Sequence, residues 1–212
     1  MKFSIGTLVN DEVLLRRYLL SSKLPVNTKI DFVKNAPSAY VGLNILLEKF
    51  HRDKSDVGIF VHQDITVSDK WLPQVENQLK KLPENWLLAG VWGRTSDETY
   101  HGKILDIRSP AVCDSDDALP MEVECLDEAC ILFNLKYSIR LDEDFLGFDL
   151  YGTYLPLLGG SMGLKSYVIN ALLIHNCTRS FSWTPDSVFL SNWELLKKKF
   201  PNRKIISTVY EE

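Results

Sequence analysis

The first half of the sequence alternates short, continuously apolar runs with longer segments whose apolar residues recur at helical spacing. The runs at 57–61 and 87–92 contain no regularly alternating polar position, which is typical of strands that are buried on both faces. Similar runs at 2–8 and 29–33 predict two further strands. Because these strands alternate with helices, we expect right-handed βαβ crossovers and an α/β fold with a mostly parallel central sheet, covered by helices on both faces.

Three helices are expected between these strands. Asn10 or Asp11 can cap the first helix, Pro37 and Ser38 open the second, and Ser68 caps the third. Each segment carries apolar residues three and four positions apart, so each helix has one face to bury against the sheet.

The second half of the chain is more irregular. A polar excursion at 93–119 holds one short expected strand at 103–107, and it is followed by a strand at 129–134, a helix at 152–162 and a strand at 166–170. Ser191 and Glu194 have the spacing of a capping box that would open a final helix. We predict one domain over residues 1–212, with a nucleotide-binding half at 1–93, an acceptor and catalytic half at 94–180, and a C-terminal helix and tail at 181–212.

Composition excludes several classes of protein. The chain has 212 residues, 45% of them hydrophobic, and a net charge of −4 without a basic stripe interleaved with aromatics, so nucleic acid is not an expected partner. No apolar run is long enough for a transmembrane segment, and the N-terminus lacks the features of a signal peptide. The four cysteines form no CxxC pair, which favours a reduced, cytoplasmic setting.

Polar side chains follow three of the expected strands. His62 and Asp64 come directly after the run at 57–61, and strand alternation points both to the same side. A carboxylate and an imidazole at this edge can hold a divalent cation against a diphosphate; alternatively, Asp64 caps a loop and His62 packs against it. Asn10 and Asn35 follow the first two strands and suit either a base and ribose or turn formation.

The order and spacing of six segments carry a family resemblance over most of residues 3–180. These segments are NAPSAYVGLNILLEKF (35–50), DVGIFVHQDI (56–65), WLLAGVWG (86–93), LDEACILFN (126–134), RLDEDFLGFDLYG (140–152) and MGLKSYVINALLIHN (162–176). Together they resemble the family 2 glycosyltransferases with the GT-A fold, most closely the bacterial branch related to the streptomycin-biosynthesis glycosyltransferase domain. In that family an Asn on the helix after the second strand precedes an aspartate motif; here these are Asn44 and His62-Gln63-Asp64, which replaces the usual Asp-x-Asp.

The resemblance implies a nucleotide-diphosphate sugar donor, a Mn²⁺ or Mg²⁺ cofactor, and a saccharide or other hydroxyl acceptor. Asp64 would bind the metal and His62 would occupy the first position of the motif. Asn10 and Asn35 would lie near the base and ribose. His175 matches a late histidine that approaches the metal or diphosphate, or else it is a satisfied histidine after a strand. A homodimer is compatible with this interpretation.

The catalytic base departs from the family pattern. The family's base opens a helix in a pattern of tyrosine, an acidic residue, another residue and Asp, whereas this chain has Gly152 and Tyr154 at the two acidic positions. Asp149 and then Asp127 are the nearest carboxylates that could serve as base. Otherwise the protein has lost transfer activity and only binds a nucleotide sugar or a partner. A metal-dependent phosphohydrolase is the least favoured activity, because it needs several carboxylates around one metal pair and the strand ends supply only one, Asp64.

Two further substrate contacts are predicted. Glu128 adjoins the possible base Asp127, and Trp92 ends the fourth expected strand. Several aromatic side chains could stack on an acceptor sugar or could instead anchor the core or a loop: Trp92, Tyr100, Phe181 and Trp183.

Overall fold

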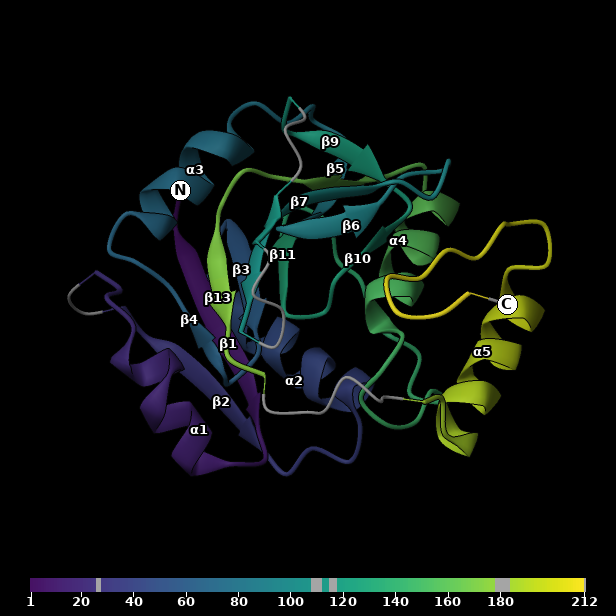
Figure 1. Cartoon of the computed structure of the whole chain (residues 1–212), viewed down its shortest axis with the longest axis horizontal. Helices are drawn as coiled ribbons and strands as arrows, with labels where there is room; N and C mark the ends of the chain where they lie inside the picture. Colours follow the sequence, from purple (N-terminus) through teal and green to yellow (C-terminus); the bar gives the residue numbers. More distant parts are fainter. Residues whose placement is uncertain (26–27, 108–111, 115–117, 178–183, 212) are drawn as a thin grey trace.

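A seven-stranded sheet forms the centre of the protein (Figure 1). The computed structural model describes residues 1–25, 28–107, 112–114, 118–177 and 184–211. In spatial order the strands are β2 (Ile30–Lys34), β1 (Phe3–Val9), β3 (Val57–Val61), β11 (Cys130–Asn134), β5 (Trp86–Gly90), β12 (Lys165–Val168) and β9 (Met121–Val123).

The strand directions confirm a mostly parallel sheet. β1 pairs in parallel with β2 and β3, and β12 pairs in parallel with β5. β11 is antiparallel to both of its neighbours, β3 and β5, and β9 is antiparallel to β12 at one edge. Five strands therefore run one way (β2, β1, β3, β5, β12), and the antiparallel β11 interrupts the predicted βαβ series.

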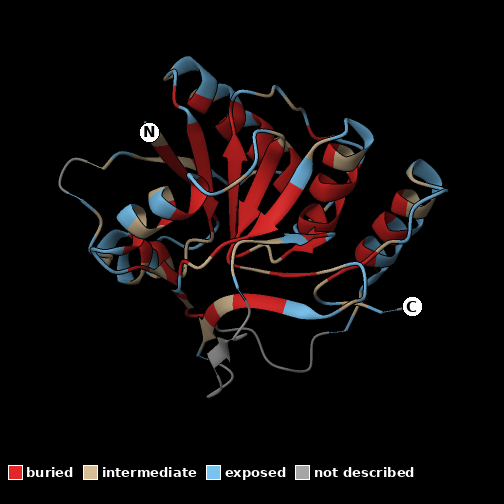
Figure 2. Cartoon of the chain, turned by 90° about the horizontal axis from the view of Figure 1, so that it is seen from above, coloured by how far each residue is buried: buried red, intermediate tan, exposed pale blue. Residues whose placement is uncertain are grey.

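Helices cover both faces of this sheet, as predicted, and each face has its own hydrophobic core. Leu15, Trp71 and Val75 pack with Ile5 and Ile59 on one face, and Figure 2 shows the central strands almost wholly buried between the layers. The helices on that face are α1 (Glu12–Arg17), the 3₁₀ helix η1 (Leu19–Ser21) and α3 (Trp71–Leu79). Those on the other face are α2 (Ala39–Arg52), α4 (Tyr151–Ser161) and α5 (Ser187–Lys199). None of the helices described is both long enough and apolar enough to cross a membrane.

Two predicted helix caps are confirmed. The Asp11 side chain accepts hydrogen bonds from the backbone N–H groups of Val13 and Leu14 at the start of α1, and Ser38 accepts one from Val41 at the start of α2. Each side chain satisfies N–H groups that have no partner within the helix.

Two other predicted caps are wrong. α3 has no side-chain cap, and Ser68 contributes only its carbonyl oxygen, which accepts from the N–H of Trp71 at 3.2 Å. α5 begins at Ser187, where Asp186 accepts from the N–H of Phe189 at 2.8 Å. Ser191 therefore lies within α5. The Ser-x-x-Glu spacing also spans one turn inside a helix, so it did not identify the helix start.

A second sheet forms beside the ends of the central strands, and residues of the predicted polar excursion supply much of it. β13 pairs in parallel with β7 and antiparallel with β4. This pairing brings the loop after β3 next to the ends of β7 and β13. In spatial order the strands are β10 (Cys125–Leu126), β6 (Trp92–Arg94), β7 (Tyr100–Asp106), β13 (Leu173–His175) and β4 (Ile65–Thr66), with β8 (Val112–Asp114) paired to β7.

The segment after α5 returns to this second sheet. The buried guanidinium of Arg94 donates to the carbonyl of Ser207 at 2.8 Å and pairs with Glu211 at 2.6 Å. The hydroxyl of Tyr100 donates to the carbonyl of Thr208 at 3.1 Å. A groove of about 360 Å³ lies along this segment, and none of the predicted site residues lines it.

Candidate functional site

The sheet places three of the predicted residues along one edge. β2, β1 and β3 are adjacent and parallel, so Asn35, Asn10 and His62, which follow them, lie at the same carboxyl edge. In an open α/β sheet this is the edge at which ligands bind.

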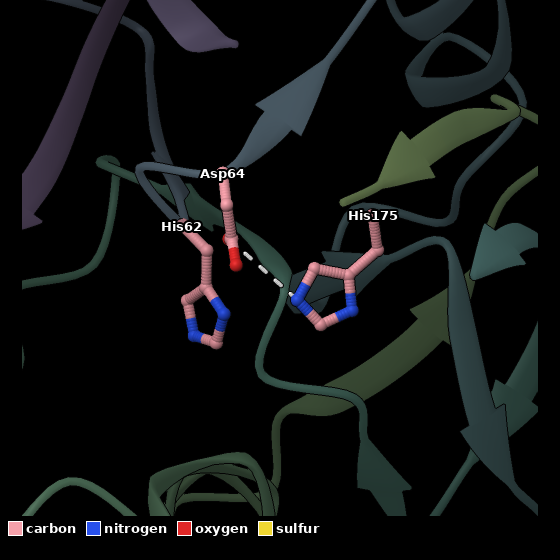
Figure 3. A group of neighbouring side chains, drawn as sticks. All are labelled: His62, Asp64 and His175. Carbon is pink, nitrogen blue, oxygen red and sulfur yellow. Dashed lines mark ion pairs between the residues drawn. The ribbon is translucent and has the colours of Figure 1, made fainter. Parts of the chain in front are cut away.

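His62, Asp64 and His175 converge at this edge (Figure 3). One ligand atom from each residue lies within 4.8 Å of the others, and Asp64 Oδ1 is 3.6 Å from His175 Nε2. His62 and Asp64 come from the loop after β3, whereas His175 ends β13. His175 is brought there because it pairs with Ile65 in the antiparallel register of β13 and β4.

Each histidine of this cluster also contacts a polar group behind it. His62 Nε2 lies 2.7 Å from the hydroxyl of Tyr151, and that hydroxyl donates to the carbonyl of Glu128 at 3.2 Å. His175 Nδ1 lies 3.3 Å from Asp106 Oδ2. Asp106 and His175 are direct partners in the β7–β13 ladder, so the sheet register itself places the carboxylate behind the imidazole.

Asn176 holds the backbone of the Asp64 loop. Both its backbone N–H and its side-chain amide donate to the carbonyl of Asp64, each at 2.9 Å, and the amide also donates to Thr66 Oγ1 at 3.0 Å. The Asp64 carboxylate is therefore carried on a loop that is anchored at the end of β13.

The chemistry of the His62–Asp64–His175 cluster suits a divalent transition metal. Two imidazoles and one carboxylate form a mixed nitrogen and oxygen set, which Mn²⁺ accepts, whereas Mg²⁺ favours oxygen ligands throughout. The two predicted metal ligands, Asp64 and His175, thus lie together with His62, and the set fits Mn²⁺ better than Mg²⁺.

Three carboxylates gather around the start of α4. Asp127 Oδ1 accepts from the N–H of Ala129 at 2.9 Å, and Glu128 Oε1 accepts from the N–H of Gly152 at 3.0 Å. Asp149 lies just before the helix, close enough for its charge to act on Glu128. Because Tyr151 contacts both the Glu128 carbonyl and His62, this acidic group adjoins the His62–Asp64–His175 cluster.

The environment of Glu128 disfavours its charged form. Burial raises the pKa of the Glu128 carboxyl well above its ordinary value, and the nearby charges of Asp149 and Asp127 raise it further, while the hydrogen bond from Gly152 opposes the shift. A carboxyl group with a raised pKa is better suited to take a proton near neutral pH than an ordinary one.

The structure explains why position 152 carries no acidic residue. A Cβ atom on Gly152 would lie 2.2 Å from the carbonyl oxygen of Leu126 and 2.8 Å from Glu128 Cγ. No larger side chain fits, and the space is taken by Glu128. Tyr154, the other departure from the family pattern, is buried in the core and accepts from the N–H of Asp142 at 3.3 Å.

Asn10 and Asn35 make local contacts at the sheet edge. The Gln63 amide donates to Asn10 Oδ1, and Gln63 Oε1 accepts from the N–H groups of Asn10 and Asp11 at 3.2 and 3.1 Å. Asn35 is exposed and has a φ of 51°, a left-handed conformation that Asn adopts more readily than most residues. A left-handed residue here fits the turn formation considered for Asn35, and its contact with the base or ribose stays a prediction.

Asn44 lies on α2 and is buried among hydrogen-bond partners, while its predicted substrate contact stays a prediction. It is 4% exposed. Its amide nitrogen donates to Leu141 O and Glu143 Oε1, both at 2.9 Å, and its amide oxygen accepts from the N–H of Leu141 at 2.8 Å. Asn44 therefore anchors the loop before α4.

Trp92 belongs to an aromatic stack. Its ring lies 5.6 Å from that of Tyr100 at an interplanar angle of 15°, and the Arg94 guanidinium lies 4.7 Å from the Tyr100 ring centre. Tyr100 is thus engaged by Trp92 and Arg94. Phe181 and Trp183 lie outside the described residues.

Sequence reasoning did not single out Asp106, Tyr151 or Asn176 as site residues. Asp106 belongs to the stretch interpreted as a polar excursion, and only the β7–β13 register brings it to His175. Tyr151 and Asn176 are next to Gly152 and His175, which the sequence did single out, so both could have been considered. Their partners, His62 and Asp64, are distant in sequence and could not be inferred.

No family model matches the chain, and no curated protein matches its sequence. Solved structures match its fold. GalNAc-T7 with UDP, GalNAc and Mn²⁺ has a TM-score of 0.65 at 11% identity, over 93% of this chain and 48% of that chain. TarS of S. aureus with UDP-GlcNAc has a TM-score of 0.60 at 13% identity, over 97% and 68%. The mannosyltransferase PcManGT of Pyrobaculum calidifontis with GDP-Man and Mn²⁺ has a TM-score of 0.51 at 9% identity, over 96% and 65%.

These likenesses show the class of fold. The chain has the GT-A fold of glycosyltransferases, a mixed α/β architecture with a mostly parallel central sheet. It spans about half the length of the GalNAc-T7 chain and about two thirds of the TarS and PcManGT chains.

Proposed function

We propose that the protein is a metal-dependent glycosyltransferase that moves a sugar from a nucleotide-diphosphate donor to a hydroxyl acceptor, such as a saccharide. The observation that carries this proposal is the convergence of His62, Asp64 and His175 at the carboxyl edge of a GT-A sheet. The matched GalNAc-T7 and PcManGT structures contain Mn²⁺ with a nucleotide or nucleotide sugar, which supports this assignment. The order of the six sequence segments of this chain favours the branch related to the streptomycin-biosynthesis glycosyltransferase domain.

In this proposal the three cluster residues hold the metal. A bound divalent ion would neutralise the charge that develops on the departing diphosphate. Asn10 lies beside the cluster at the end of β1, where it can contact the base or ribose. Asn176 fixes the Asp64 loop so that the carboxylate keeps its position.

The acidic group at the start of α4 supplies the base. The acceptor hydroxyl loses its proton as its oxygen attacks the sugar carbon, and a carboxylate positioned nearby takes that proton. Asp149 and Asp127 remain our proposed bases. Glu128 joins them, because its raised pKa suits it to proton transfer and because it occupies the space beside Gly152.

Donor turnover tests the proposal directly. The protein is incubated with a panel of UDP- and GDP-sugars and Mn²⁺, and release of UDP or GDP is measured. We expect slow hydrolysis of at least one donor that EDTA abolishes. Asp64→Asn should remove it, whereas Asp53→Asn, a matched change in the loop after α2, should not. No turnover of any donor, together with no Mn²⁺-dependent binding of UDP or GDP, would disprove the proposal.

A second candidate is a GT-A-like module that binds a nucleotide sugar without transferring it. The observation that favours it is the pair Gly152 and Tyr154 at the two positions where the family pattern has acidic residues. It predicts Mn²⁺-dependent UDP or GDP binding with no turnover that depends on Asp149, Asp127 or Glu128. A large loss of donor turnover in Asp149→Asn, Asp127→Asn or Glu128→Gln would rule it out.

A further inference from the structure

We infer that Tyr151 and Asp106 are positioning residues that select which nitrogen of His62 and of His175 faces the metal. This inference rests on the proposed function, because it concerns the same metal cluster. It extends the site from three residues to five and assigns a role to the two side chains that lie behind His62 and His175.

The contacts of Tyr151 define the tautomer of His62. The Tyr151 hydroxyl has one proton to donate. It donates that one proton to the carbonyl of Glu128 at 3.2 Å. The hydroxyl oxygen must then accept at its 2.7 Å contact with His62, so Nε2 of His62 carries the ring proton.

A neutral imidazole protonated at Nε2 has its lone pair on Nδ1. Figure 3 shows Nδ1 of His62 directed toward Asp64 and His175. Tyr151 therefore turns the ligating nitrogen of His62 into the cluster.

Asp106 contacts Nδ1 of His175, whereas Tyr151 contacts Nε2 of His62. Oδ2 of Asp106 lies 3.3 Å from Nδ1 of His175, an ion-pair contact that favours a proton on Nδ1 and leaves Nε2, on the side of Asp64, as the nitrogen for the metal. A carboxylate behind a ligating imidazole fixes the ring orientation and raises its basicity. The two histidines thus use opposite nitrogens, Nδ1 of His62 and Nε2 of His175.

The tautomers are tested first in the wild-type protein. Long-range ¹H–¹⁵N correlation spectra of the metal-free protein should show His62 protonated at Nε2 and His175 at Nδ1. The opposite tautomer at either residue would overturn the inference for that residue without any variant being made. In Tyr151→Phe the His62 signals should lose their Nε2–H preference while those of His175 keep theirs.

Metal affinity supplies the second readout, with Mn²⁺ alone as the probe. Tyr151→Phe and Asp106→Asn should each weaken Mn²⁺ binding about 10- to 100-fold, the usual effect of removing such an outer partner. Tyr154→Phe, which removes a hydroxyl from the same helix, and Asp53→Asn are the matched controls and should bind as the wild type does. Circular dichroism confirms that each variant is folded.

The outcomes separate the two proposals. If the wild type binds Mn²⁺ and both variants bind it equally well, this inference is overturned while the proposed function stands. If the folded wild type binds no Mn²⁺, even with UDP or GDP present, the proposed metal-dependent function fails, whatever the tautomers.

Discussion

The backbone N–H of Gly152 donates to Oε1 of Glu128 at 3.0 Å, at the start of a helix that lacks a capping side chain of its own. The N-cap residue, Leu150, has a left-handed φ of 70° and a side chain that cannot accept a hydrogen bond. A carboxylate from another loop therefore satisfies the helix end. Glu128 and Gly152 depend on one another, since the carboxylate can approach only where there is no Cβ atom.

Gly152→Ala should destabilise the protein by about 1–3 kcal/mol, because the added Cβ would overlap the carbonyl of Leu126 and displace Glu128. Urea denaturation followed by circular dichroism measures the change. Gly160→Ala in the same helix is the matched control. Its Cβ would meet only the flexible end of Arg203, so that variant should be unchanged or more stable. Equal stability of the Gly152 variant and the wild type would contradict the close approach.

Glu128→Gln should lower donor turnover by about 10²- to 10⁴-fold while leaving Mn²⁺-dependent UDP binding intact. The glutamine oxygen can still accept from Gly152, so the helix end stays satisfied and the change isolates proton transfer. Nucleotide release and isothermal titration give the two readouts. An unaltered turnover rate would exclude Glu128 as the base and return the role to Asp149 or Asp127.

The raised pKa of Glu128 predicts that the free energy of unfolding depends on pH. The pKa of Glu128 is raised in the folded protein above its ordinary value of 4.5. Its contribution to stability is therefore fully present below about pH 4.5 and is lost as the pH rises through the folded pKa. Urea denaturation of the wild type and of Glu128→Gln should give similar free energies of unfolding at low pH, with the variant gaining relative to the wild type as the pH rises. A difference that does not change with pH would show that the carboxyl group has an ordinary pKa.

Metal binding should stabilise the folded chain. At a Mn²⁺ concentration of about 100 times the dissociation constant, linkage predicts a gain of about 2.7 kcal/mol. Thermal unfolding with and without EDTA measures it. Asp64→Asn and His175→Ala should each remove most of the shift, because each removes one of three ligands. A shift that persists in both variants would place the ion elsewhere.

Asn44→Ala should destabilise the protein by about 1–3 kcal/mol, since it leaves the buried N–H and carbonyl of Leu141 without their partner. Binding of UDP and Mn²⁺ should be unaffected. Asn35→Gly is a useful comparison, because glycine adopts the left-handed backbone readily and stability should hardly change. Loss of nucleotide affinity in a folded Asn44 variant would restore the substrate contact expected from the sequence.

Local pattern was sufficient for much of the fold. The run at 57–61 corresponds to β3 residue for residue, and Asp11 and Ser38 cap the helices they were expected to cap. The antiparallel direction of β11 could not be predicted from its sequence. Every residue of Cys130–Asn134 is buried, and a strand that is apolar throughout has the same pattern whether it runs parallel or antiparallel to its neighbours.

Some residues of the candidate site could be predicted from the sequence, and others could not. Asp64 could be chosen because a carboxylate at a strand end suits a metal, and His175 was chosen because the family resemblance implies a late histidine there. Asp106 could not, because nothing in its own segment shows that β7 pairs with β13. Asn44 was assigned through a family position, whereas its burial and its bonds to the loop at 141–143 depend on a contact nearly one hundred residues away in sequence.

The antiparallel β11 has a consequence for how the chain reaches its native state. β3 and β5 flank β11 and do not pair with each other, so residues 1–93 alone cannot close the central sheet. During synthesis, one edge of β3 and both edges of β5 stay unpaired until the later strands β11 and β12 emerge, and β11 then fills the gap between β3 and β5. Residues 1–93 are therefore not expected to form an independent folding unit, and a fragment that ends near residue 93 should aggregate rather than fold.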